Sequence, residues 1–88
     1  MGYNNEVRAH AKEVTMPHIV VKLWPGRSEE QKQQLADRIV QTVMETLNMD
    51  EKSISVGIEE VASERWTQEV YVPDILERKS SLYKKPGY

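Results

Sequence analysis

The sequence contains no cysteine and no phenylalanine. Without cysteine the chain can form neither a disulfide framework nor a zinc site built on thiolates, and it has no thiol nucleophile. Its two histidines, His10 and His18, are too few for a histidine-rich metal site. Redox chemistry at thiols and structural zinc are therefore excluded as the basis of function.

Long apolar runs are missing as well. No stretch approaches the roughly 20 apolar residues that a helix needs to cross a bilayer. The first 15 residues lack the apolar centre of a secretory signal. A net charge of −2 with 30% charged residues also lacks the basic excess of a nucleic-acid binder. We therefore expect a cytoplasmic protein with neither a membrane nor a nucleic acid as partner.

The chain has 88 residues, which predicts one domain. A domain of this size buries only about 60% of the surface that its unfolded chain exposes, so association with further copies is a common source of stability. Residues 1–15 are polar and weakly patterned. We interpret residues 1–16 as an N-terminal extension (a tag, a misplaced start or a flexible arm) and residues 17–88 as the domain.

Three segments carry clear periodicity. Residues 18–24 are β-branched and apolar, have the length of a strand, and are bounded by proline on both sides. Residues 28–47 predict a long helix, because Ser28 and Gln31 fit a capping box and an apolar stripe follows at helical spacing. Its members are Leu35, Ala36, Ile39, Val40, Val43, Met44 and Leu47. Residues 53–59 alternate strictly, as in a half-buried strand.

The order of strand, long helix and strand predicts an α/β fold built on a βαβ unit. Its crossover is long enough for the two strands to pair in parallel with a right-handed connection. Beyond Val61 the pattern is weaker. Ser63 is predicted to cap a short helical turn that ends at Trp66, and Pro73 is predicted to open a short C-terminal helix.

Few residues carry chemistry by their type and spacing alone. Phosphate-binding loops, zinc-protease motifs and nucleophile elbows are absent. Arg27, between a strand end and a helix start, could bind an anion, although a solvated loop arginine is commoner. Trp66 could line a pocket or fill the core. His18, beside a proline, is more typical of a surface residue than of a catalyst.

Met16-Pro17 is the unusual pair. If translation begins at Met16 and the methionine is removed, the mature chain begins at Pro17. The nitrogen of Pro17 is then a secondary amine, which is a usable base. In the full 88-residue chain the same nitrogen is a tertiary amide without basicity.

Four segments resemble the 4-oxalocrotonate tautomerase family. They are PHIVVKLWPGRSEEQKQQLADRIV (residues 17–40), SISVGIEEV (53–61), SERW (63–66) and the tail KKPGY (84–88). The tail is similar to that of the dimeric bacterial branch associated with phenylpyruvate-type enol–keto tautomerisation. The resemblance implies two βαβ units that pair into a four-stranded sheet as a homodimer. It also implies an isomerase that interconverts enol and keto forms of small 2-oxo acids without a metal or organic cofactor.

The resemblance also implies roles for single residues. Pro17 takes the position of the catalytic N-terminal proline, Arg27 that of the arginine that grips the substrate carboxylate, and Trp66 that of the pocket aromatic. Ser55 stands where the family has a second arginine that polarises the keto oxygen. A serine can donate one hydrogen bond there but supplies no cation. Lys22, Arg65 or a lysine of the tail could stand in for that charge.

The implied chemistry is physically consistent. An α-amine has a reference pKa of about 8. An apolar wall such as Trp66 and a cation such as Arg27 both disfavour the protonated amine, which moves its pKa toward neutrality. Two rival functions stay open: a non-catalytic binding module in which residues 1–16 block Pro17, and a hydratase or dehalogenase that uses Pro17 as an acid.

Overall fold

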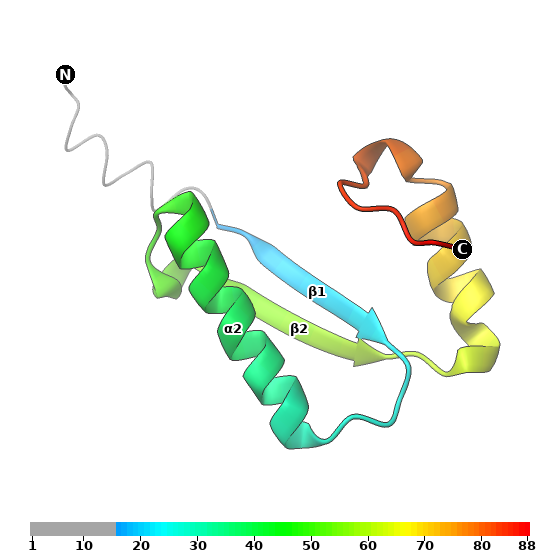
Figure 1. Ribbon diagram of the computed structural model, residues 1–88, viewed down its shortest axis with the longest axis horizontal. Coiled ribbons are helices and arrows are strands. Elements are labelled where there is room, and N and C mark those ends of the chain that lie inside the picture. The colour runs from blue at the N-terminus through cyan, green and yellow to red at the C-terminus, as the bar shows by residue number, and fades with distance from the viewer. Residues whose placement is uncertain (1–15) are drawn as a thin grey trace. The chain divides into compact units, whose positions relative to one another are not determined.

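The computed structural model describes residues 16–88, and the predicted N-terminal extension falls almost wholly outside them. The described chain divides into two units. The first unit holds residues 16–21 and Arg27–Ile58, and the second holds Lys22–Gly26 and Glu59–Tyr88. The strands of the described chain are β1 (His18–Leu23) and β2 (Ser55–Glu60), and its long helix is α2 (Glu29–Leu47). Figure 1 shows the two strands side by side with α2 running along them.

β1 and β2 form a two-stranded parallel sheet. The Ser55 N–H donates to the Pro17 carbonyl over 3.3 Å, and the Val61 N–H donates to the Leu23 carbonyl over 2.8 Å. The donors and acceptors of these two bonds advance in the same direction along both strands, as in a parallel ladder. The predicted βαβ unit is therefore confirmed.

α2 begins and ends where local signals require it. Ser28 is the N-cap: its hydroxyl accepts from the Gln31 N–H, and the Gln31 side chain accepts from the Ser28 N–H. Asn48 ends the helix in the left-handed region at φ 54°, and its N–H donates to Met44. The apolar stripe is only half-buried, and its two outer members, Leu35 and Leu47, are exposed.

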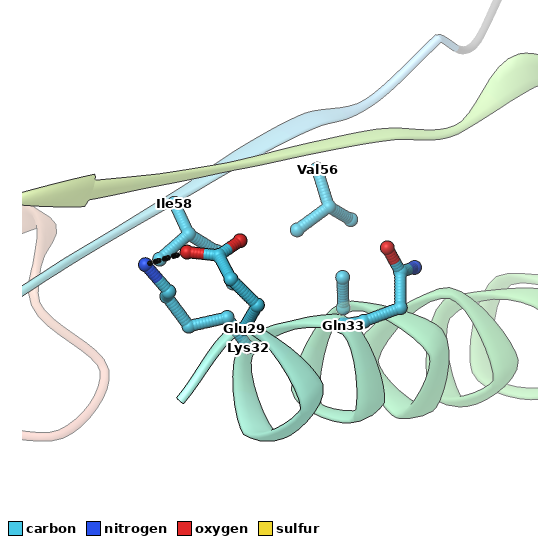
Figure 2. Close-up of a pocket in the computed structure, with 6 residues that line it drawn as sticks. Glu29, Lys32, Gln33, Val56 and Ile58 are labelled. Atoms are coloured by element: carbon cyan, nitrogen blue, oxygen red, sulfur yellow. Dashed lines mark ion pairs between the residues drawn. The ribbon is translucent and has the colours of Figure 1, made fainter. Parts of the chain in front are cut away.

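Within the first unit, α2 covers the face of the sheet to which Val56 and Ile58 point. Figure 2 shows these two β2 side chains opposite the first turns of α2, where Lys32 forms an ion pair with Glu29 over 2.8 Å. The space between them is a cavity of about 260 Å³. Ile19 and Val21 of β1 are half-buried while His18 and Val20 are exposed, which is the alternation expected of a strand with one covered face.

In the second unit, β2 is followed by a 3₁₀ turn (Ser63–Arg65) and a π-helix (Thr67–Leu76). Ser63 is not the cap that the sequence predicted. Ala62 holds that position, and its methyl side chain cannot accept a hydrogen bond. The Ser63 hydroxyl donates to the Glu64 carboxylate over 3.2 Å. Val61 and Val70 are buried here.

Contrary to the sequence prediction, Pro73 does not open the second helix. The helix starts earlier, at Thr67, and Pro73 lies inside it. Proline has no N–H, so a regular α-helical ladder is interrupted at this point. The wider turn of a π-helix accommodates such an interruption, and the pattern ends with the Glu77 N–H donating to the Val72 carbonyl over 3.0 Å. Over residues 16–88, no helix is both long enough and apolar enough to cross a membrane.

Candidate active site

Pro17 lies directly before β1 and is bound to the first residue of β2. Its carbonyl accepts from the Ser55 N–H, and the Ser55 hydroxyl lies 2.6 Å from Nδ1 of His18. Both side chains of this pair are exposed. The start of the two strands therefore presents, within the first unit, the Pro17 residue, a hydroxyl and an imidazole at one end of the sheet.

Arg27 belongs to the loop between β1 and α2. The residue before it, Gly26, has φ of 128°, a conformation that a side chain would strain. Glycine at this position lets the chain turn so that Arg27 is followed at once by Ser28, the N-cap of α2. Arg27 is exposed, and it therefore offers a guanidinium to an anion arriving from solvent near a helix N-terminus.

The second unit contains an aromatic cavity of about 550 Å³, lined by Lys22, Leu23, Trp24, Trp66 and Tyr88. The rings of Trp24 and Trp66 meet edge to face with their centroids 6.5 Å apart. The indole N–H of Trp66 donates to the Tyr88 hydroxyl over 3.4 Å, and the Tyr88 ring lies 5.9 Å from that of Tyr71. These contacts make an apolar wall with one cation beside it.

That cation is already paired. Nζ of Lys22 lies 2.6 Å from Oδ2 of Asp74, and the two side chains are 32% and 39% exposed. The hydrogen bond to Asp74 raises the pKa of the Lys22 ammonium above its usual 10.5, with its charge adding to the effect against partial desolvation. Lys22 is therefore held as a charged ammonium.

The structure brings together some of the residues that the sequence singled out. Pro17 and Ser55 are joined by a hydrogen bond, and Arg27 belongs to the same unit. Trp66 belongs to the second unit, where it lines the aromatic cavity.

The sequence did not single out Trp24 and Tyr88 as partners of Trp66, nor His18 as the partner of Ser55. Alternation along residues 18–24 puts His18 and Trp24 on the same face of that strand, a signal that could have pointed to these two residues but not to Tyr88.

Residues 17–74 match the family described as "Tautomerase enzyme". A probable tautomerase of Xylella fastidiosa is 48% identical over 73 residues, which are 83% of this chain and 89% of that protein. Tautomerase PptA of Cronobacter sakazakii is 42% identical over 74 residues, covering 83% and 97%.

Solved structures agree with these relatives. TomN, a 4-oxalocrotonate tautomerase homologue in the tomaymycin biosynthetic pathway, superposes with a TM-score of 0.56 at 32% identity, covering 74% of this chain and 97% of TomN. YwhB, another such homologue, has a TM-score of 0.51 at 39% identity, covering 52% and 75%. The chain belongs to the 4-oxalocrotonate tautomerase family and is an isomerase of the tautomerase kind.

Proposed function

We propose that residues 17–88 interconvert the enol and keto forms of small 2-oxo acids, with Pro17 as the general base once it is the first residue of the chain. One observation carries this proposal: the family match begins at Pro17. The described structure is compatible with it, because Pro17 precedes β1 and its own nitrogen takes no part in the ladder bond made by its carbonyl.

The reaction moves one proton and no other atom. In the keto form, the Pro17 amine takes a proton from the carbon next to the carbonyl, and the electron pair of that C–H bond shifts to give an enolate oxygen. Water protonates that oxygen to give the enol, and the Pro17 ammonium returns its proton to water. In the opposite direction the Pro17 ammonium delivers its proton to the carbon as the oxygen loses one, so the amine is restored. This scheme needs no metal and no organic cofactor.

The other residues bind the substrate. Arg27 grips the substrate carboxylate through its exposed guanidinium, which can form two parallel hydrogen bonds to a carboxylate. Trp66 provides the apolar wall for the substrate side chain. Ser55 donates to the substrate oxygen on which charge develops.

We further propose that two copies form the working particle. Only Met49, Val61 and Val70 are buried hydrophobic residues among those described, and α2 has none. A two-stranded sheet is marginal by itself, whereas four strands covered by two helices bury both apolar layers. Pairing of two sheets would cover the half-buried stripe of α2 and the open strand edges.

The test compares three chains in the ketonisation of phenylenolpyruvate: the chain starting at Pro17, the full 88-residue chain, and the short chain with Pro17→Ala. Mass spectrometry first confirms each N-terminus. We expect activity only in the chain that starts at Pro17, because the full chain holds this nitrogen as an amide. Equal activity of the full chain would contradict the proposal. Inactivity of all three would favour a binding module on the same fold.

A further inference from the structure

We propose that His18 positions the Ser55 hydroxyl as the donor to the substrate oxygen, so that the His18–Ser55 pair stands in for the family's second arginine. The inference rests on the proposed function, since it concerns the same reaction. The inference is based on the 2.6 Å contact between Nδ1 of His18 and Oγ of Ser55, at the end of the sheet next to Pro17.

The pair is held by the backbone of the sheet. The Ser55 N–H donates to the Pro17 carbonyl, which fixes the register that sets His18 opposite Ser55. Val56, the residue after Ser55, lies against α2, so Ser55 and His18 occupy the face of the sheet that α2 leaves open. Both side chains are exposed, so a substrate can reach them.

The proton on Nδ1 decides what Ser55 can do. If the imidazole carries a proton on Nδ1, that N–H donates to Oγ of Ser55, and the serine hydrogen is free to donate to a substrate oxygen. If Nδ1 is bare, the serine hydrogen points back to the imidazole and the substrate receives nothing. His18 therefore orients the hydroxyl of Ser55 toward the substrate oxygen.

As Pro17 takes the proton from carbon, the new enolate oxygen accepts a hydrogen bond from the Ser55 hydroxyl, which stabilises the developing charge. Water protonates that oxygen to give the enol, and the Pro17 ammonium returns its proton to water, which restores the amine.

Three of the rival cations, Lys22, Arg65 and Lys84, already have partners in this structure. Lys22 is paired with Asp74, and Nε of Arg65 lies 3.0 Å from Oε2 of Glu69. In the tail, the Lys84 ammonium donates to the carbonyl of Lys85 over 2.7 Å. Nδ1 of His18, in contrast, contacts the hydroxyl of Ser55, the residue that stands where the family has its second arginine.

The test uses paired variants of the chain that starts at Pro17. Asparagine places a nitrogen donor near the position of Nδ1, and glutamine places one near that of Nε2. We therefore expect His18→Asn to keep most of the activity, while His18→Gln and His18→Ala lower kcat about 10- to 100-fold with little change in KM. Ser55→Ala should lower kcat by a similar factor, and Ser55→Thr, which keeps a hydroxyl, should restore part of it.

A double variant separates a shared role from two independent ones. If His18 acts through Ser55, adding His18→Ala to Ser55→Ala costs little more than Ser55→Ala alone. Multiplied losses would overturn the inference, as would wild-type kcat in Ser55→Ala or equal losses in His18→Asn and His18→Gln. In those cases the parent chain is active, so the proposed function stands. An inactive parent chain would instead overturn the proposed function and this inference with it.

Discussion

The ammonium of Lys22 in β1 and the carboxylate of Asp74 in the π-helix form an ion pair with a 2.6 Å contact. The pair lies in the second unit, where Lys22 also lines the aromatic cavity. It keeps the charge of Lys22 next to the tryptophans while satisfying that charge within the protein. A free cation for a substrate oxygen is thus not expected from Lys22.

Loss of this pair should destabilise the protein in a pH-dependent way. Asp74 raises the pKa of Lys22 above 10.5, so the folded state holds the Lys22 proton more tightly than the unfolded chain. The stabilisation is complete below 10.5 and disappears as the pH rises through the raised value. We expect Asp74→Asn to lower Tm near neutral pH and the difference from the parent to shrink in strongly alkaline buffer.

A suitable control for this prediction is Asp37→Asn. Asp37 lies on the exposed side of α2, where its partner is the neutral Gln33 side chain. Its difference from the parent should not follow the ionisation of a lysine. A Tm difference for Asp74→Asn that stays constant through the alkaline range would contradict the role given to Lys22.

The capping box should matter for α2. Ser28→Ala removes the hydroxyl that accepts from the Gln31 N–H over 3.0 Å. Loss of an N-cap oxygen should reduce the free energy of unfolding by about 1 kcal/mol. Ser28→Asp, which keeps an acceptor and suits the helix dipole, should retain the stability of the parent. Urea unfolding followed by far-UV circular dichroism measures both, and equal stability of all three chains would show that the cap is dispensable.

Arg27 should act on substrate binding. Arg27→Ala removes the proposed partner of the substrate carboxylate, and the loss of hydrogen bonds to a charged group should raise KM about 10- to 100-fold. Arg27→Lys should recover only part of this, because an ammonium cannot make the two parallel bonds of a guanidinium. Steady-state kinetics on the chain starting at Pro17 gives both values. Arg38→Ala, on an exposed position of α2, serves as the control that should leave KM unchanged.

Tyr88 should stabilise the aromatic cavity mainly through its ring. Tyr88→Phe removes the long, exposed bond from Trp66, which should cost no more than about 0.5 kcal/mol. Tyr88→Ala also removes the ring that lies against Tyr71 and should cost about 1 kcal/mol. Tryptophan fluorescence during urea unfolding reports on both. If Tyr88→Phe proved as costly as Tyr88→Ala, the hydroxyl and not the ring would be the stabilising group.

The state of association provides an independent prediction. Light scattering on the chain starting at Pro17 should give a mass near two subunits, because residues 16–88 bury few hydrophobic side chains in one copy and the tail resembles that of the dimeric branch. A stable monomer, or a particle of six subunits, would contradict the proposed four-stranded pairing.

Features set by short stretches of sequence were predictable. The capping box and the apolar spacing placed the start of α2 within one residue, a β-branched and apolar run located β1, and alternation located β2. Pro73 was misplaced because the bonding pattern around an internal proline depends on which carbonyls are within reach, and local sequence does not reveal that.

Contacts between distant segments were less accessible from sequence. Trp66 was singled out, but its partners Trp24 and Tyr88 lie far from it along the chain. His18 was predicted to be a surface residue and is exposed, but its contact with Ser55 was not predicted because it depends on the register of β1 against β2. The register of two parallel strands is decided by packing against α2, and no single segment determines it.

The central claim is that the nitrogen of Pro17 is the base, and its own titration tests this most directly. The chain starting at Pro17 is labelled with ¹⁵N-proline, the Pro17 resonance is followed against pH, and kcat/KM is measured in the same buffers. The account predicts that Pro17 titrates below the value of about 8 usual for an α-amine and that the acid limb of kcat/KM has the same midpoint. An acid limb of kcat/KM whose midpoint differs from that of the Pro17 titration would contradict this claim. The same kcat/KM profile in the 88-residue chain, whose Pro17 does not titrate, would also contradict it.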